Sequence, residues 1–187
     1  GQYLEWTLPH RYPDNRGNRR YFTVASSPAE QQVRLGVKFY EPMSTFKRAL
    51  LAMKPNDTLS ASHVAGDFTL PKDQKRKFAF IAGGIGITPF RSMIKYLLDT
   101  KEKRDIILLY SNYAPADIAY KDIFDQGERQ IGLKTIYTIS NTPYPADWQG
   151  ERGMVDEKMI MRVAPDFKER IFFISGSNNM VVAFEEI

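Results

Sequence analysis

The fold is decided by the stretch Phe78-Ala79-Phe80-Ile81-Ala82-Gly83-Gly84-Ile85-Gly86-Ile87-Thr88-Pro89-Phe90. Its apolar first part is typical of a strand that is buried on both faces. The glycines permit positive φ and close approach of a ligand to the backbone, and Thr88 and Pro89 predict the cap and first turn of a helix. Free N–H groups at such a turn attract phosphate. The same pattern also suits a tight strand-to-helix turn that binds nothing.

The sequence after about residue 77 alternates between buried strands and helices. Strands are predicted at residues 78–82, 106–110, 133–139 and 171–175, and helices at 89–100, 115–126, 156–163 and from Asn178 onward. Such alternation predicts a parallel sheet with right-handed crossovers, and ligands bind at the carboxyl ends of its strands. Residues 83–88, 111–112 and 175–177 follow strands, so we expect them to share one edge.

The sequence before residue 72 has a different rhythm. Short strands are predicted at residues 3–8, 20–25, 33–40 and 58–62, with a helix at 44–53, which indicates an antiparallel barrel or sandwich. The lysine-rich residues 71–76 are the expected linker. The predicted division is therefore an antiparallel domain at 1–72 and an α/β domain at 73–187.

Composition limits the chemistry of the chain. Among 187 residues there is no cysteine, which excludes a disulfide, a thiolate-held iron–sulfur cluster and a cysteine nucleophile here. The two histidines, His10 and His63, lie far apart and form no zinc pattern, so no metal site is expected. Redox chemistry would need an organic cofactor. The net charge of +4 suits an acidic partner or phosphorylated ligand, or is a solvated surface.

Two further features concern the ends of the chain and its polarity. The sequence starts in a strand-like pattern and stops in a helix-like one, so we expect a piece of a longer protein. No apolar run approaches the roughly 20 residues of a membrane helix, and no nucleic-acid partner is expected.

A second motif is Arg20-Tyr21-Phe22-Thr23-Val24-Ala25-Ser26-Ser27-Pro28. Strand periodicity puts Arg20 and Phe22 on one face, with Thr23 opposite or at the strand end. An arginine, an aromatic ring and a hydroxyl can together hold a charged planar ligand, and arginine binds phosphate with two hydrogen bonds. Taken alone, the motif favours a simpler interpretation, a strand with an exposed arginine.

Five motifs in order resemble the ferredoxin–NADP reductase-like superfamily of flavin reductases. They match its Arg-x-Tyr-(Ser/Thr) flavin motif, the helix under the flavin pyrophosphate, a Gly-x-Phe segment, the Gly-Gly-x-Gly-x-(Thr/Ser)-Pro loop and a late Cys-Gly-Pro-x-x-Met segment. The matching residues are 20–28, 42–46, 66–71, 83–89 and 175–180. The resemblance implies a partial flavin-binding barrel followed by a Rossmann-like nucleotide-binding domain.

The resemblance also implies roles for individual residues. Thr23 and Ser175 would lie nearest the reacting atoms of the flavin and the nicotinamide. The flavin, FAD more than FMN, would be bound by Arg20, Phe22, Thr23, Val24, Ala25, Ser44 and Thr45. The co-substrate, NADH or NADPH, would be bound by Gly83, Gly84, Gly86, Thr88, Pro89, Ser111, Asn112, Gly176 and Met180.

The implied function is an NAD(P)H-dependent flavin oxidoreductase that passes electrons to an acceptor. The acceptor would be a missing domain or a partner such as an acidic ferredoxin or flavodoxin, in the cytoplasm or at the cytoplasmic face of a membrane. Ser175 and Ser177 stand where the superfamily has cysteine and proline, and Phe22 replaces tyrosine. These departures keep open a flavin-binding electron-transfer or regulatory subunit without NAD(P)H oxidation. A nucleotide-binding domain without flavin is a third alternative.

Specificity for the nucleotide is predicted from the loop after the second parallel strand. Residues 110–117 contain no arginine or lysine to meet the 2′-phosphate of NADPH, and Asp117 would repel it. This predicts a preference for NADH. Lys121, one helical turn beyond, could reverse it, or could instead pair with Asp117 at the surface.

Overall fold

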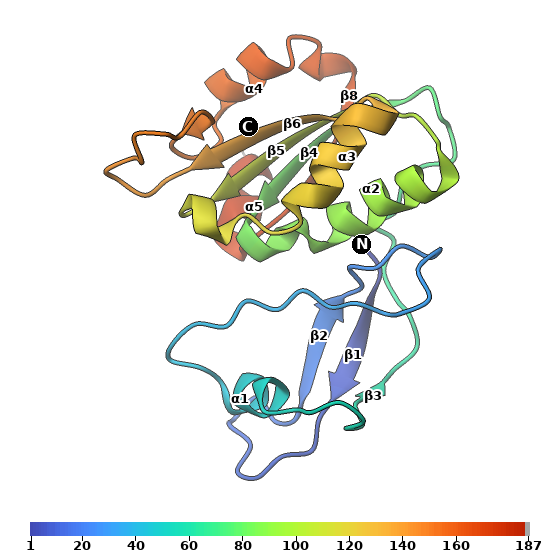
Figure 1. The fold of residues 1–187 in the computed structure, drawn as a ribbon, viewed down its shortest axis with the longest axis vertical. Coiled ribbons are helices and arrows are strands. Elements are labelled where there is room, and N and C mark those ends of the chain that lie inside the picture. The colour runs from blue at the N-terminus through green and yellow to red at the C-terminus, as the bar shows by residue number, and fades with distance from the viewer. Residues whose placement is uncertain (186–187) are drawn as a thin grey trace.

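A computed structural model describes residues 1–185 of the chain. Glu186 and Ile187, the end of the helix expected from Asn178 onward, lie outside the described residues. The chain forms a small antiparallel half and a larger half built on a parallel sheet, which appear at the bottom and top of Figure 1. The amino terminus lies at the junction of the two halves.

The antiparallel half confirms the pattern expected for the first part of the sequence. Its strands are β1 (Tyr3–Thr7), β2 (Arg19–Thr23) and β3 (Ser60–Ala61), in the order β2-β1-β3. The predicted helix is α1 (Thr45–Leu51). It begins where the Ser44 hydroxyl accepts a hydrogen bond from the Lys47 amide at 3.3 Å, so Ser44 is its N-cap.

The strand expected at residues 33–40 is wrong, and β3 is shorter than the strand expected at 58–62. In the first segment only Leu35 pairs, through an isolated bridge to Val24. Continuous pairing would need a neighbouring strand along residues 36–40, and the described residues supply none. The segment instead crosses to the other half, where the Lys38 ammonium lies 2.8 Å from the Asp117 carboxylate.

The parallel sheet confirms the second pattern. Its strands are β4 (Lys77–Gly83), β5 (Ile106–Asn112), β6 (Lys134–Ile139), β7 (Glu151–Arg152) and β8 (Arg170–Ser175), in the order β7-β6-β5-β4-β8. The two-residue β7 was not expected, because its sequence has no apolar run. The central strand β4 is buried between β5 and β8, as its uninterrupted apolar sequence predicts.

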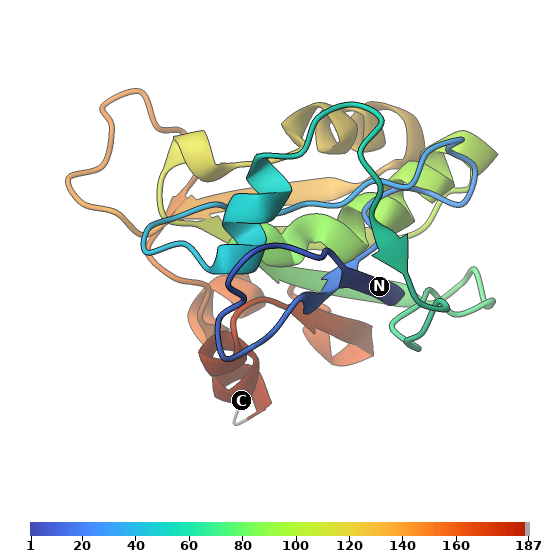
Figure 2. The same cartoon turned by 90° about the horizontal axis from the view of Figure 1, so that it is seen from below.

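Helices cover both faces of this sheet (Figure 2). The helical segments of this half are η1 (Gly84–Ile87), α2 (Thr88–Thr100), η2 (Pro115–Asp117), α3 (Lys121–Ile131), α4 (Glu157–Val163), η3 (Phe167–Glu169) and α5 (Asn178–Glu185). Phe78 and Phe80 pack with α2 and α3 on one face, whereas Ile81 packs with α4 on the other. The strand alternation thus builds two cores from one sheet.

Two local expectations are corrected. The single helix expected at 115–126 is broken, because Tyr120 has φ 59° and separates η2 from α3. The expected cap at Thr88 is also wrong, because η1 runs directly into α2 and Thr88 is already the first helical residue. Its hydroxyl donates to the Ile85 carbonyl at 3.3 Å. Pro89 does lie in the first turn, as predicted.

Replacing Phe124 with alanine tests the core between α3 and the sheet. Its ring is fully buried and lies edge-on to Tyr110, with 6.1 Å between the ring centroids. Phe124→Ala should therefore lower the free energy of unfolding by about 3–5 kcal/mol in a urea titration. Tyr12→Ala removes an aromatic ring that is 86% exposed and should change it by less than about 0.5 kcal/mol. Equal losses in the two variants would contradict this assignment of the core.

Candidate functional site

The carboxyl ends of β4, β5 and β8 meet at one edge of the parallel sheet. Gly83 is in register with Ser111, and Ala82 with Ser175. The expected shared edge is therefore confirmed. One detail differs, since Ser111, Asn112 and Ser175 are the last residues of their strands and do not follow them.

The glycines of the loop have different reasons to be glycine. Gly84 has φ +51°, and no atom lies within 4 Å of the position that a Cβ would occupy. Gly86 has ordinary φ, but a Cβ there would overlap the Ser175 carbonyl and lie 2.8 Å from Cα of Gly176. Gly84 thus needs conformational freedom and leaves open space, whereas Gly86 lets two loops pack together.

Met180 joins these glycines from α5. A Cβ at Gly176 would lie 2.5 Å from the Met180 sulfur, and a Cβ at Gly83 would overlap the same atom. The thioether therefore lies over both glycines. Gly83, Gly86, Ser175, Gly176 and Met180 form one cluster, as expected from the sequence, and we call this cluster the glycine edge.

Asn112 ends β5 beside the glycine edge and is 4% exposed. Neither its amide nitrogen nor its amide oxygen has a hydrogen-bond partner among the described residues. A buried amide without partners is costly unless a ligand or water satisfies it. The open space at Gly84 leaves room for a nucleotide, whereas the Asn112 amide is shielded from solvent near the Tyr110 hydroxyl, and Thr88 and Pro89 are buried beneath the loop.

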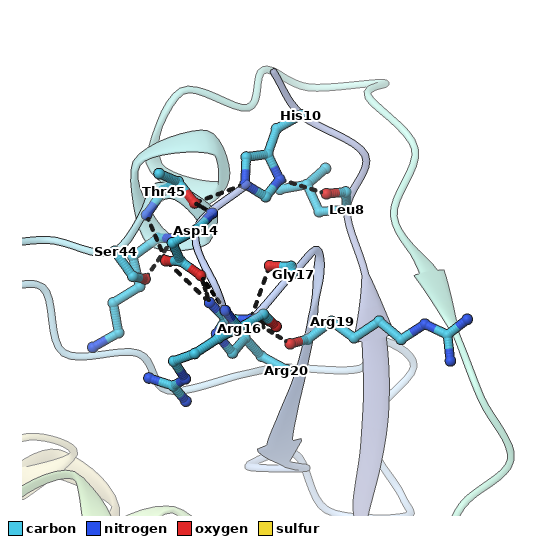
Figure 3. Close-up of polar contacts among 10 residues, drawn as sticks. Leu8, His10, Asp14, Arg16, Gly17, Arg19, Arg20, Ser44 and Thr45 are labelled. Atoms are coloured by element: carbon cyan, nitrogen blue, oxygen red, sulfur yellow. Dashed lines mark hydrogen bonds and ion pairs between the residues drawn. The ribbon is translucent and has the colours of Figure 1, made fainter. Parts of the chain in front are cut away.

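Arg20 of the second motif is already bonded within the chain (Figure 3). Its guanidinium donates to the carbonyls of Arg16, Gly17 and Arg19 at 2.6–3.0 Å. It also pairs with the Asp14 carboxylate at 3.0 Å, and the residue is 9% exposed. The sequence predicts Arg20 as a ligand for phosphate, and in the structure the anion beside it is Asp14.

Asp14 also bonds to the start of α1 (Figure 3). Its carboxylate accepts from the Thr45 amide at 3.3 Å, and the Thr45 hydroxyl accepts from the Asp14 amide at 3.0 Å. Burial would raise the pKa of Asp14, but bonds from the Arg16 and Thr45 amides and from Arg20 outweigh it and hold the pKa below its usual value. A carboxylate therefore occupies the place between Arg20 and α1 that the sequence assigns to a phosphate. We call the group formed by Asp14, Arg20, Ser44 and Thr45 the anion cradle.

Arg20 and Phe22 share one face of β2, as predicted. Both contact the buried Phe46 of α1, at 5.2 Å from the Arg20 guanidinium carbon and 6.0 Å between the two phenyl rings. Thr23 is on the opposite face, where it lines a hollow of about 340 Å³ with Tyr3 and Tyr21. The strand thus separates the two side chains that were expected beside the same flavin ring.

Backbone groups of Val24 and Ala25 were expected to face the flavin. The Val24 amide donates to the Gln2 carbonyl at 2.9 Å, and the Ala25 amide to the Arg34 carbonyl at 2.8 Å. The Ala25 carbonyl accepts from Arg91 of α2 at 2.8 Å. These three groups therefore have partners within the chain.

The contacts between the halves, among them the following three, were not predicted from the sequence. Lys38 pairs with Asp117, Glu30 pairs with Arg91, and a Cβ at Gly36 would lie 2.8 Å from the Tyr120 hydroxyl. Arg91 alone carries a signal that could have been found, because it interrupts the apolar stripe of α2 with a charge. The other residues lie in turns, loops or the single turn of η2, where the sequence has no periodicity.

Lys121 does not reach Asp117. Its ammonium pairs with Asp125 at 2.7 Å, one turn further along α3. The Asp117 carboxylate bonds to Lys38 and also accepts from the Ala114 amide at 3.2 Å. The hydrogen bond from Lys38 holds the pKa of Asp117 below its usual value, so this carboxylate is ionised but neutralised by its partner.

Within the described residues, 1–185, no group of three or more histidine, aspartate or glutamate side chains is arranged to hold a metal ion. None of the helices described is long and apolar enough to cross a membrane.

Residues 80–186, more than half of the chain, match the profile of the family described as "Oxidoreductase NAD-binding domain". The chain is 26% identical over 190 residues to NADH-cytochrome b5 reductase 2 of Lodderomyces elongisporus, covering 96% of this chain and 62% of that protein. It is 30% identical over 112 residues to the glycine betaine monooxygenase reductase subunit of Pseudomonas aeruginosa, covering 59% and 31%. The chain thus spans less than two thirds of these relatives.

Solved structures show the same fold. The cytochrome P450 reductase GcoB of Amycolatopsis superposes with a TM-score of 0.82 at 22% identity, covering 100% of this chain and 55% of that one. The cytochrome b5 reductase domain of Ulva prolifera nitrate reductase gives a TM-score of 0.81 at 21% identity, covering 96% and 75%. The fold class expected from the sequence, a partial barrel followed by a Rossmann-like domain, is confirmed.

Replacing Gly86 with alanine tests the packing of the glycine edge. The new methyl group would overlap the Ser175 carbonyl, and since backbone cannot move aside cheaply, the two loops should separate. We expect Gly86→Ala to speed hydrogen exchange of the Ser175 and Gly176 amides at least tenfold. Gly83→Ala is the matched control, because its methyl group would meet the flexible Met180 side chain. Unchanged exchange in Gly86→Ala would show that the loops do not depend on this contact.

Proposed function

Because the chain belongs to the ferredoxin–NADP reductase-like superfamily through its oxidoreductase NAD-binding domain, we propose that it passes a hydride from NAD(P)H to a flavin and then electrons to an acceptor. The observation that supports this proposal is the presence, in one chain, of two arrangements whose donors and open backbone suit a phosphate. The anion cradle lies in the antiparallel half, and the glycine edge lies in the parallel half. We propose that residues 1–72 form the flavin-binding domain and residues 73–187 the nucleotide-binding domain.

The anion cradle is our proposed site for the flavin pyrophosphate. Arg20, Ser44 and Thr45 would hold it, and the phosphate would take the place of the Asp14 carboxylate. A helix start with two adjacent hydroxyl residues suits a pyrophosphate, which favours FAD over FMN. Phe22 would contact the flavin ring from the α1 face of β2. Thr23 lies on the other face, and the backbone groups of Val24 and Ala25 have partners within the chain, so these three residues would border the ring only where it extends past the end of β2.

The glycine edge is our proposed site for the nicotinamide nucleotide. Gly83, Gly84 and Gly86 would approach its phosphates closely, while Ser111 and Asn112 would bond to its adenosine half. Ser175, Gly176 and Met180 would border the nicotinamide. Thr88 and Pro89 would support the loop from below, since both are buried.

The flavin and the nicotinamide supply the hydride chemistry when they are bound. The protein's part is to hold the two rings face to face and to exclude water. Good alignment of reacting groups contributes about 7–11 kcal/mol to lowering a barrier. Thr23 and Ser175 are the side chains we propose nearest to the reacting atoms, and neither needs to act as an acid or base.

We propose that the acceptor is a protein or a further domain. Relatives carry names such as cytochrome b5 reductase and monooxygenase reductase subunit, which indicate protein acceptors for those proteins. The net charge of +4 favours an acidic carrier of the ferredoxin or flavodoxin type. We also propose a cytoplasmic location, where nicotinamide nucleotides are available to the glycine edge.

A second candidate is a flavin-binding electron-transfer or regulatory subunit that does not oxidise NAD(P)H. It is favoured by the Met180 thioether, which covers Gly83 and Gly176 in the described structure. Serine at 175 in place of cysteine also favours it. The two candidates differ in whether a nicotinamide nucleotide reduces the bound flavin.

The deciding experiment is the visible spectrum of the protein at its natural length, followed by anaerobic mixing with NADH or NADPH. We expect flavin absorption and rapid bleaching. Flavin that neither nucleotide reduces would support the second candidate. A protein purified and refolded with FAD or FMN that still binds neither would overturn the proposed function.

Replacing Arg20 with alanine tests the anion cradle. Loss of a charge-assisted contact of about 1.5–3 kcal/mol should weaken flavin binding on the order of 10- to 100-fold in a fluorescence titration. Arg19→Ala is the matched control, because its side chain is 65% exposed and precedes Arg20 on the other face of β2. Thermal unfolding checks that both variants fold. Full flavin affinity in a folded Arg20→Ala variant would contradict the assignment.

The nucleotide preference is predicted to be for NADH. Residues 110–117 hold no arginine or lysine, and the nearby Lys38 and Lys121 are paired with Asp117 and Asp125. We expect kcat/KM for NADH to exceed that for NADPH by about tenfold or more, equivalent to about 1.4 kcal/mol. Asp117→Asn should narrow the difference, since it releases Lys38. A tenfold preference for NADPH would contradict the prediction.

A further inference from the structure

Helix α2 connects the two halves through a row of side-chain contacts. Its polar groups bond to three consecutive residues just beyond β2, in the pairs Arg91 with Ala25, Ser92 with Ser26, and Asp99 with Ser27. The distances between the bonded atoms are 2.8, 2.7 and 2.8 Å. Helix α2 therefore fixes the position of the segment just after β2 relative to the parallel half.

Arg91 makes the strongest of these contacts. Besides the Ala25 carbonyl, its guanidinium donates to both oxygens of Glu30, one of them at 2.9 Å. Glu30 accepts a further bond from the Ser27 amide at 2.7 Å. The Tyr120 ring lies 5.5 Å from the guanidinium carbon on another side. A planar guanidinium with two parallel bonds to a carboxylate fixes direction as well as distance.

Burying this ion pair costs desolvation free energy, because both charged groups lose contact with water. Arg91 is 5% exposed, and its Nε has no hydrogen-bond partner among the described residues. A buried pair often stabilises a protein less than apolar residues of the same size would. The hydrogen bonds from Arg91 lower the pKa of Glu30 to about 2, so the pair stays ionised at neutral pH. If the only role of these two residues were to hold the halves together, leucine or methionine would do so equally well.

The pair lies close behind both proposed cofactor sites. Helix α2 begins at Thr88, directly after the glycines of residues 83–86, and Arg91 lies three residues further along this helix. Arg91 bonds to the carbonyl of Ala25, two residues beyond Thr23 at the end of β2. Glu30 lies further along the chain, where it accepts a hydrogen bond from the Ser27 amide. Arg91 therefore connects the glycine edge to the end of β2 directly, and Glu30 holds Arg91 in place.

We propose that Arg91 and Glu30 are positioning residues that set the spacing between the flavin and the nicotinamide nucleotide. The proposal rests on the proposed function of the two sites. Apolar replacements would keep the halves in contact but allow them to slide by fractions of an ångström. A displacement of about 1 Å in a reacting group can slow a reaction on the order of 100-fold.

The test compares three variants with the parent protein at its natural length. The double variant Arg91→Met with Glu30→Met removes both charges, so that no lone charge stays buried. Arg104→Met is the matched control. Arg104 is 8% exposed and bonds to Glu102 and to the carbonyls of Pro71 and Asp73, near the amino ends of the strands and away from the glycine edge.

We expect the double variant to keep its flavin content, and its KM for NADH should stay within threefold of the parent. Its limiting rate of flavin reduction in anaerobic stopped flow should fall at least tenfold. The long-wavelength absorbance that stacked flavin and nicotinamide produce should weaken in parallel. Arg104→Met should lower thermal stability without changing this rate. Arg91→Lys, which keeps the charge but loses the parallel bonds, should recover the rate only in part.

Two results would overturn the proposal: a parental rate in the double variant, or an equal fall in Arg104→Met. If the parent itself carries no flavin or is not reduced, the proposed function fails separately. Calorimetry then decides on the pair, because a device that holds the halves in register should make them unfold together. The parent should show one transition and the double variant two, and a single transition in both would refute the pair's role.

Discussion

The whole arrangement depends on burial of β4. This strand has β5 on one side and β8 on the other, and helices cover both of its faces, so its register is fixed from four directions. The three strands are parallel, and the register pairs Gly83 with Ser111 and Ala82 with Ser175. The carboxyl ends of the three strands therefore lie side by side. The glycine edge is thus a consequence of core packing, and the chemistry proposed for it comes from backbone geometry more than from reactive side chains.

Much of this half could be predicted from the sequence, because its signals are repeated and local. An apolar run bounded by glycines, followed by an amphipathic helix, occurs with little competition from other patterns, and the strands at 78–82 and 106–110 were found within two residues of their ends. The predictions that were wrong concern segments whose conformation depends on contacts with residues distant in sequence. Residues 33–40 have the composition of a strand, but a strand forms only where a neighbour supplies hydrogen bonds. Tyr120 breaks a helix through a left-handed φ that its side chain does not announce.

The candidate site was predicted in part for the same reason. Gly83, Gly86, Ser175 and Met180 are brought together by strand ends, which periodicity reveals. The partners of Arg20 are not revealed in this way. Asp14 lies in a turn that the sequence marks only as a turn, yet it bonds to both groups assigned to a phosphate. Whether a charged side chain meets a ligand or another residue depends on tertiary contacts, and spacing along the chain carries little information about them.

The Lys38–Asp117 pair has a consequence for the seam between the halves. Its side chains are 44% and 26% exposed, so dissolved ions screen their attraction, whereas Arg91 and Glu30 are shielded from solvent. Rising ionic strength therefore weakens the Lys38–Asp117 attraction more than the Arg91–Glu30 pair. Of these two charged contacts between the halves, salt acts on the one at η2 and spares the one that holds Ala25.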